Sequence, residues 1–220
     1  VALVGPSGAG KSSISMLLPR LYDVTEGAVW IDGIDVRDIS QDNLRQIVGI
    51  ALQEAVLFQG DVRFNLKFAK PDASDETMMG AAQAADSYGF VTNLPEKWQA
   101  PVSRRGYNFS GGQRQRLSMS RTLTTEPRIL ILDDSTSALD VATESRVQAA
   151  IPGFTNNVTT LYVAQRISAV IDLDKIVLLA NGEIVDVGNH EELMDRSALY
   201  QEIYESQLGG GITADLEVDA

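Results

Sequence analysis

Short apolar runs, separated by polar and glycine-containing segments, set the pattern along this chain. Such runs, bounded by turn residues, are typical of buried β-strands. After the first run, Ile14, Leu17 and Leu21 recur at helical spacing within residues 11–21, which predicts a helix. Strands separated by helical segments predict an α/β fold with a mostly parallel, doubly wound sheet. The predicted strands are residues 1–4, 29–31, 34–36, 48–52, 129–132, 160–164, 176–179 and 183–187.

Two dipeptides join neighbouring runs into hairpins. Asp32-Gly33 and Asn181-Gly182 both lie between apolar runs. Asp-Gly and Asn-Gly adopt the turn conformation that the twist of a β-hairpin requires. The parallel sheet is therefore expected to carry antiparallel additions.

The middle of the chain differs in amino-acid composition from the parts on either side. Residues 58–126 contain an alanine-rich, methionine-containing stretch at 78–85 and few β-branched runs. We therefore predict a mostly helical subdomain, inserted into a core built from residues 1–57 and 127–208.

The last part of the chain predicts two helices and a tail. Asn189, followed three residues later by Glu192, is typical of a capping box that starts a helix. A second helix is predicted at residues 198–207. Residues 209–220 are acidic and aperiodic after a run of glycines, which indicates a flexible tail.

Composition narrows the class of protein. The chain has 220 residues, 44% of them apolar, enough for one core with an attached subdomain. A formal net charge of −12 disfavours nucleic acid as a partner. Without cysteine the chain has no disulfide framework, and a cytosolic setting is the default. Because the sequence begins at Val1, inside an apolar run and not at a Met, we expect that an N-terminal part of the domain precedes it.

A phosphate-binding loop follows the first predicted strand. Two glycines five residues apart, followed by Lys and Ser, sit between a strand and a helix, as a P-loop requires. Lys11 is expected to contact the β- and γ-phosphates of ATP, and Ser12 to bind Mg²⁺. The pattern predicts a P-loop NTPase (RecA-like) core. The expected nucleotide-binding residues are Gly5, Pro6, Ser7, Gly8, Ala9, Gly10, Lys11, Ser12 and Ser13.

A carboxylate ends the apolar run at residues 129–132. Asp133 follows that run directly, as the second magnesium ligand of a P-loop NTPase does. A lone Asp at a strand end is usually a solvated terminus. Together with the P-loop, however, Asp133 is expected to lie near Mg²⁺.

The segment Phe109-Ser110-Gly111-Gly112-Gln113 resembles the signature motif of ABC ATPases. That motif is very specific, and with the P-loop it extends the resemblance from Val1 to about Gln207. In this family, the signature of one subunit closes on the γ-phosphate held by a second. The resemblance therefore implies a head-to-tail dimer, in which Ser110 to Gln113 contact the partner's ATP.

Further segments resemble family motifs. Gln53 matches the Q-loop glutamine, which the family places near Mg²⁺, and residues 137–140 resemble the loop that crosses the dimer interface. Residues 57–66 and 102–108 are similar to the surface with which exporters receive their membrane domain. Arg104 stands where exporters usually carry Glu, so this contact is expected to be altered.

Two positions depart from the active family pattern. The residue after the magnesium aspartate is usually Glu, which polarises the attacking water, but here it is Asp134. The switch histidine is replaced by Gln165, which can hydrogen-bond a phosphate but does not titrate near neutral pH. Asp134, Gln165 and Gln53 are the candidate catalytic residues. The only histidine, His190, is interpreted as a surface residue at the start of a helix.

These features favour one half of an asymmetric ABC exporter, with a degenerate site of its own and an intact signature for the partner's site. The resemblance places it on the cytoplasmic face of the membrane, attached to a transmembrane domain not present in this chain. A slow symmetric homodimer, a soluble ABC ATPase of DNA repair or translation, and a non-hydrolysing regulatory nucleotide binder remain the alternatives. The transported substrate is not encoded in this segment.

Overall fold

A computed structural model describes residues 1–155 and 158–208 of the chain. By its internal contacts the chain forms two compact units. The first combines Val1–Ile14 with the chain from Leu161 onward, and the second is Ser15–Thr160. The predicted tail at residues 209–220 lies outside the described residues. No helix in the described part of the chain is long and apolar enough to cross a membrane.

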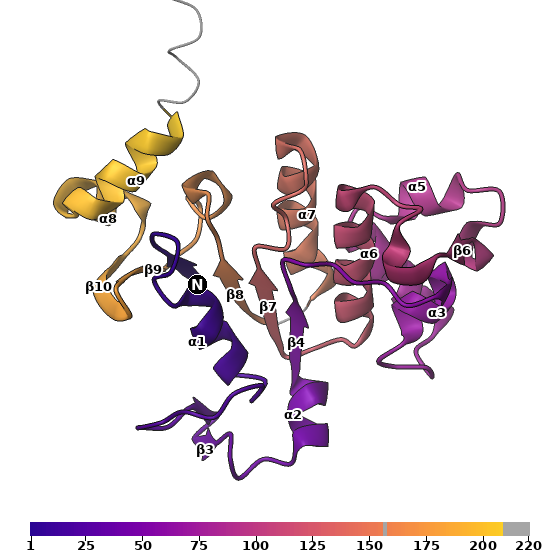
Figure 1. Ribbon diagram of the computed structural model, residues 1–220, viewed down its shortest axis with the longest axis horizontal. Helices are drawn as coiled ribbons and strands as arrows, with labels where there is room; N and C mark the ends of the chain where they lie inside the picture. The colour runs from indigo at the N-terminus through magenta and orange to yellow at the C-terminus, as the bar shows by residue number, and fades with distance from the viewer. Residues whose placement is uncertain (156–157, 209–220) are drawn as a thin grey trace, which may run out of the picture. The chain divides into compact units, whose positions relative to one another are not determined.

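The first unit is built around a parallel strand arrangement (Figure 1). β1 (Ala2–Val4) pairs in parallel with β8 (Thr159–Val163) and with β9 (Ile176–Ala180). β10 (Glu183–Gly188) is antiparallel to β9. The mostly parallel sheet with an antiparallel addition is thus confirmed.

The turn between β9 and β10 has the conformation that its sequence predicts. Asn181 and Gly182 have φ values of 52° and 82°. Positive φ at both central residues defines the hairpin turn that matches strand twist. The Asn-Gly dipeptide therefore fixes where the antiparallel addition begins.

The terminal helices cover an apolar core of the first unit. α8 (His190–Arg196) begins with the predicted capping box of Asn189 and Glu192. α9 (Ala198–Leu208) places Tyr200 in the core with no exposed surface. The core that they complete contains Ala2, Val4, Ala164, Ile167, Val170, Ile176, Leu178, Leu193 and Tyr200.

α1 (Lys11–Leu17) is shorter than the helix predicted at residues 11–21. The Arg20 N–H donates to the Leu17 carbonyl and the Leu21 N–H to the Met16 carbonyl. Arg20 has a φ of 52°. This pair of bonds across a left-handed residue is a Schellman termination. The sequence did not predict this helix end, because the left-handed position is occupied by Arg and not by the usual Gly.

The second unit contains another parallel strand pair and a small hairpin. β4 (Val48–Ala51) pairs with β7 (Ile129–Asp133) from Val48 opposite Ile129 onward. β2 (Trp30–Ile31) and β3 (Ile34–Asp35) form the hairpin predicted around Asp32-Gly33. α2 (Gln41–Ile47), capped by Ser40, was not predicted.

The stretch predicted as helical carries most of the helices of the second unit (Figure 1). A pair of two-residue strands, which the sequence did not predict, also lies there: β5 (Gly60–Asp61) and β6 (Pro101–Val102). Their shared core includes Leu57, Leu66, Met78 and Leu117, all almost fully buried. The helices are α3 (Val62–Lys67), α4 (Asp75–Ala84), α5 (Tyr88–Thr92) and α6 (Gly111–Thr124), followed after β7 by α7 (Val141–Phe154).

Candidate nucleotide site and signature helix

The glycine-rich loop of residues 5–10 lies between β1 and α1 in the first unit. Gly5, Gly8 and Gly10 have φ values of 154°, 81° and 97°, which residues with a Cβ rarely adopt. A Cβ on Gly5 would also meet the Leu179 carbonyl oxygen at 2.0 Å. The loop therefore needs glycine, and this backbone suits amide groups that turn toward phosphate.

Lys11 crosses this loop with its side chain. Its Nζ donates to the carbonyl oxygens of Gly5 and Pro6 at 2.8 and 2.9 Å, and the residue is 8% exposed. An ammonium held in this position faces the loop where a triphosphate binds in P-loop proteins. Ser12 and Ser13 follow on α1 and are exposed.

The end of β7 carries two consecutive carboxylates in the second unit. Asp133 is 3% exposed, and its Oδ2 accepts a hydrogen bond from the buried Ser15 Oγ at 3.0 Å. Asp134 has a φ of 47°. Asp tolerates this left-handed conformation better than most residues.

Gln53, which follows β4, reaches Asp134 although 81 residues separate them. Its Nε2 donates to Asp134 Oδ2 at 2.8 Å. The parallel pairing of β4 with β7 accounts for this contact, because the carboxyl ends of parallel neighbours meet at one edge of a sheet. The predicted Q-loop glutamine and the predicted water-polarising carboxylate thus lie together.

Gln165 lies just after β8 in the first unit and is exposed. Its carbonyl oxygen accepts a hydrogen bond from Gln207 Nε2 at 2.7 Å. The Ile167 N–H donates to Gln207 Oε1 at 2.8 Å. One side-chain amide of α9 therefore fixes the backbone on both sides of Arg166, a contact that no sequence signal indicated.

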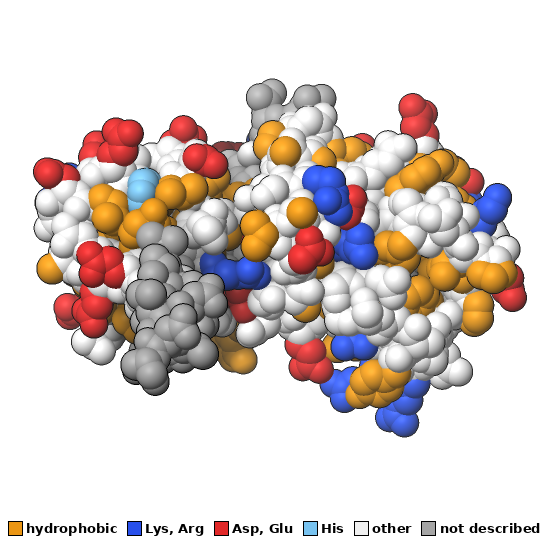
Figure 2. Space-filling view, turned by 90° about the horizontal axis from the view of Figure 1, so that it is seen from above, with side chains coloured by type: hydrophobic (Ala, Val, Ile, Leu, Met, Phe, Trp, Pro, Cys, Tyr) orange, Lys and Arg blue, Asp and Glu red, His pale blue; other side chains and the backbone are white. Residues whose placement is uncertain are grey.

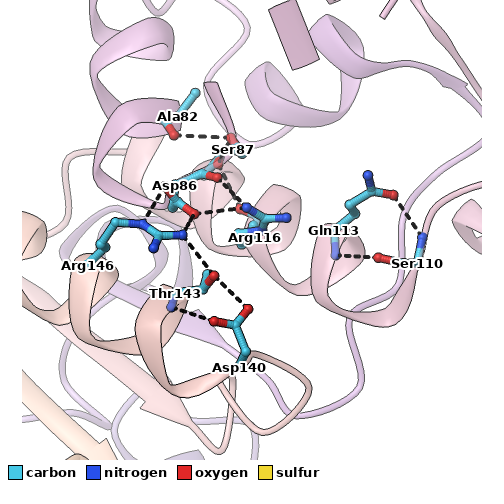
Figure 3. Close-up of polar contacts among 10 residues, drawn as sticks. Ala82, Asp86, Ser87, Ser110, Gln113, Arg116, Asp140, Thr143 and Arg146 are labelled. Carbon is cyan, nitrogen blue, oxygen red and sulfur yellow. Dashed lines mark hydrogen bonds and ion pairs between the residues drawn. The ribbon is translucent and has the colours of Figure 1, made fainter. Parts of the chain in front are cut away.

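The signature segment forms the N-terminus of α6. The Ser110 side chain accepts from the Gln113 N–H at 3.2 Å, and the Gln113 side chain accepts from the Ser110 N–H at 3.0 Å (Figure 3). This reciprocal capping box holds the first turn in place. A Cβ on Gly112 would meet the Ala138 carbonyl oxygen at 3.0 Å. Glycine therefore leaves room for the loop of residues 137–140, which lies against the helix start.

A polar network joins α6 to α7 farther along (Figure 3). Asp86 accepts hydrogen bonds from Arg116 Nη1 at 2.9 Å and from Arg146 Nη2 at 3.0 Å. Arg146 Nη2 also donates to Thr143 Oγ1 at 2.9 Å. The Thr143 hydroxyl donates in turn to Asp140 Oδ2 at 2.8 Å. This network was not predicted from the sequence.

Asp140 caps α7 at the end of the loop of residues 137–140. Its Oδ1 accepts from the Thr143 N–H at 2.9 Å. Hydrogen bonds from the Thr143 N–H and hydroxyl hold the pKa of the Asp140 carboxyl below its usual value. The folded chain therefore favours the ionised form of this capping carboxyl.

A family model described as ABC transporter matches residues 1–137, which is more than half of the chain. The chain belongs to the ABC transporter family. Within that family it is an ATP-binding domain, of the class of ATPases that carry a P-loop and a signature motif.

Curated relatives and a solved structure agree with this assignment. The ABC domain is 44% identical over 207 residues to the putative multidrug export ATP-binding/permease protein YgaD of Bacillus subtilis (strain 168). It is 43% identical over 207 residues to the corresponding protein SAV1866 of Staphylococcus aureus (strain Mu50 / ATCC 700699). A bacterial Atm1-family ABC exporter with ATP bound has a similar fold, with a TM-score of 0.90 and 38% identity.

The ABC domain is only part of the length of these proteins. Each comparison covers 94% of this chain and 36% of the relative. The relatives carry permease segments by name. What a whole transporter containing this ABC domain does is therefore a matter of proposal.

Arg104 and Arg105 occupy a short 3-10 helix, Arg104–Gly106, ahead of the signature. Arg105 has a φ of 58° and pairs with Glu54 at 2.8 Å. Both partners are mostly exposed, so this ion pair contributes little to stability. Glu54 follows Gln53 directly, and the pair therefore brings the loop after β4 near the segment that precedes the signature.

His190 lies at the first position of α8, as predicted. Its Nδ1 is 3.0 Å from the Tyr200 hydroxyl, and its ring lies against Tyr204 with centroids 5.3 Å apart. Burial raises the pKa of Tyr200 to about 12. His190 is half-buried by these contacts, more than the predicted surface residue would be.

The predicted site residues fall into two groups by unit. Residues 5–13 and Gln165 belong to the first unit, while Gln53, Asp133, Asp134 and the signature belong to the second. Within the second unit the structure brings Gln53 to Asp134 and the signature to the loop of residues 137–140. The catalytic and ligand roles of all these residues stay predictions.

Proposed function

We propose that this chain is the cytoplasmic nucleotide-binding domain of an ABC exporter with unequal ATP sites. Its own site binds Mg-ATP and hydrolyses it slowly, and its signature helix completes the faster site of a second, different ATPase domain. The single observation that carries this proposal is an intact signature beside Asp134 and Gln165, two departures at catalytic positions of the family.

The signature supports the half of the proposal that concerns the partner. Ser110 is exposed and caps α6 through the reciprocal bonds with Gln113. Gly111 and Gly112 belong to the first turn of a helix of 14 residues, at its positive end, where backbone N–H groups have no partner within the helix. This arrangement suits the γ-phosphate of an ATP that a second domain holds in its own P-loop.

Asp134 supports the half that concerns the chain's own site. Its carboxylate is one methylene shorter than that of Glu, and Gln53 holds it through a 2.8 Å hydrogen bond. A retreat of about 1 Å at a reacting group can lower the rate about 10²-fold. Gln165 adds a second defect, because an amide carries no positive charge toward the γ-phosphate.

The residues present fit a bound Mg-ATP. The glycines of the P-loop have the backbone that a phosphate cradle needs, and Lys11 faces into that loop. Ser12, Asp133 and Gln53 would hold Mg²⁺, since hydroxyl, carboxylate and amide oxygens suit a hard cation. The ion supplies neutralisation of the phosphate charge.

An apolar surface of the second unit supports attachment to a membrane domain. Phe58, Phe64 and Phe68 are each more than one-third exposed. The Phe58 ring stacks on that of Phe68, and the Phe64 ring meets the Phe68 ring edge-to-face. Tyr107 is 69% exposed. Apolar side chains gather over this end of the unit in the space-filling view (Figure 2). Such a patch suits a protein partner, and the relatives named as multidrug exporters make an exporter's permease the proposed one.

The test is single-turnover ATP hydrolysis in the assembled transporter. Each site is measured while the other is silenced by replacing its water-polarising carboxylate. We expect the site built on this chain's P-loop to be at least about tenfold slower than the other. Equal rates would reject the unequal sites, and transport by this chain without a second kind of subunit would favour the symmetric homodimer.

A further inference from the structure

The Gln115 side chain bridges segments that lie far apart in the sequence. It is 5% exposed and belongs to the second turn of α6. Its Oε1 accepts from the Ala138 N–H at 2.9 Å. Its Nε2 donates to Ser137 Oγ at 3.1 Å and to the Gln53 carbonyl oxygen at 3.4 Å. One buried amide thus joins α6, the loop of residues 137–140 and the loop that follows β4.

The three hydrogen bonds of the Gln115 side chain differ in length, and the longest is expected to break first. The contact with the Gln53 carbonyl lies at the outer limit of a hydrogen bond, while the two contacts with the loop of residues 137–140 are shorter. The longest bond is the weakest. Gln115 is therefore held more firmly to residues 137 and 138 than to residue 53.

The neighbouring residue ties the same helix to α7. Arg116 shares Asp86 with Arg146 of α7 (Figure 3), and Gly112 packs on Ala138 at the helix start. α6 and the loop of residues 137–140 are consequently joined at several points. We treat them as one rigid segment, to which the Gln115 side chain links the loop after β4.

The other side of Gln53 completes the connection. The Gln53 side chain donates to Asp134, while the Gln53 carbonyl accepts from Gln115. A displacement of Gln53 would therefore move both the Asp134 carboxylate and, through Gln115, helix α6.

We propose that Gln115 is a positioning residue that couples the loop carrying Gln53 to the signature end of α6 and to residues 137–138. This inference rests on the proposed function, in which those segments complete the partner's ATP site. Gln115 itself touches no nucleotide. Through it, the position of Gln53 regulates turnover at the partner's site.

The experiment compares Gln115→Met and Gln115→Glu in the assembled transporter. Met keeps the length of the side chain and removes every bond. Glu keeps an acceptor for the Ala138 N–H and can donate to neither Ser137 nor Gln53. Gln83, an exposed amide on α4, supplies matched control variants with the same replacements. Steady-state kcat and KM at the partner's site are measured together with amide hydrogen exchange at Ala138.

We expect kcat to fall about tenfold in both Gln115 variants, because both lose the bond to the Gln53 carbonyl and one hydrogen bond is worth about that factor. KM for ATP should change less than about twofold, because Gln115 contacts no ligand. The Ala138 amide should exchange faster in Gln115→Met and keep its protection in Gln115→Glu. A lesion that is merely structural would raise exchange in both variants alike.

Other outcomes overturn the inference. A kcat in Gln115→Glu equal to that of the Gln83 variants removes the coupling to Gln53, and this holds even if Gln115→Met fails to fold. Ser110→Arg is assayed in parallel, because full turnover in that variant rejects the proposed function without testing Gln115. The bridging role of Gln115 is then tested by hydrogen exchange alone, and unchanged exchange of the Ala138 amide in Gln115→Met overturns it.

Discussion

Restoring the family residues at Asp134 and Gln165 directly tests the proposal that this chain's own site is weakened. The change is the double variant Asp134→Glu, Gln165→His, with both single variants for comparison. Glu returns the carboxylate toward the water, and His supplies a group that can donate to the γ-phosphate and carry positive charge. Residues that act as a unit give non-additive effects, so we expect neither single change to restore the full rate.

The structure sets the size of the expected gain. A carboxylate misplaced by about 1 Å costs up to about 10²-fold. Asp134 has a φ of 47°, however, and a longer side chain in the left-handed region adds strain of about 1 kcal/mol, or about fivefold. The extra methylene also disturbs the 2.8 Å bond with Gln53. We therefore expect the double variant to gain at least about tenfold, or about 1.4 kcal/mol of barrier.

The assay is single-turnover hydrolysis in a transporter whose other site is silenced. Asp172→Glu, at an exposed position outside the predicted site, is the matched control for adding a methylene. Two results refute the reasoning. If the double variant stays as slow as the unmodified chain, side chains other than these limit the site. If the unmodified chain is already as fast as the partner's site, the site is not degenerate.

The remaining predictions address other parts of the molecule. Lys11→Ala should weaken Mg-ATP binding at the chain's own site at least about tenfold, through loss of a charge-assisted contact, and unchanged affinity in an equilibrium titration would contradict the P-loop role. Ser110→Arg should abolish most turnover at the partner's site by blocking closure, which ATPase assays of the reconstituted dimer measure. Asp140→Asn should lower the free energy of unfolding at pH 7, because the Asp140 pKa is depressed in the folded chain. That contribution is present above the ordinary pKa of about 4 and is lost as pH falls through the folded value, so urea titrations of the two proteins should converge at acid pH.

The sequence predicts the strands well and the helix ends poorly, for physical reasons. An apolar run such as β7 and a dipeptide such as Asn181-Gly182 carry their own structural preference. The end of α1 depends on Arg20, which adopts a left-handed conformation that its residue type does not announce. The β5–β6 pair places Gly60 opposite Val102, far apart in the chain. Each of these strands has two residues, which is too short for a periodic pattern to show.

The candidate site was predictable in its parts but not in its internal contacts. Motif spacing identifies the P-loop, Asp133 and the signature, since each is a local pattern with a known chemical requirement. The bond between Gln53 and Asp134 depends on β4 pairing with β7 in parallel, which no local pattern fixes. Gln115 and Gln207 are ordinary amides in the sequence, and only the fold shows which backbone groups they reach.

The backbone at Asp134 gives a physical reason for Asp at this position. Asp is enriched among residues with positive φ, and here its carboxylate also accepts the long-range hydrogen bond from Gln53. Glu at the same φ of 47° would gain reach toward the water, adopt this backbone less readily and disturb the bond with Gln53. Under the proposed function, the departure from the family pattern lowers catalysis while it favours the fold, a trade-off common at active sites. If a second, intact site uses the signature that this chain presents, as proposed, selection for turnover acts on Ser110 and its helix and leaves position 134 free to favour stability.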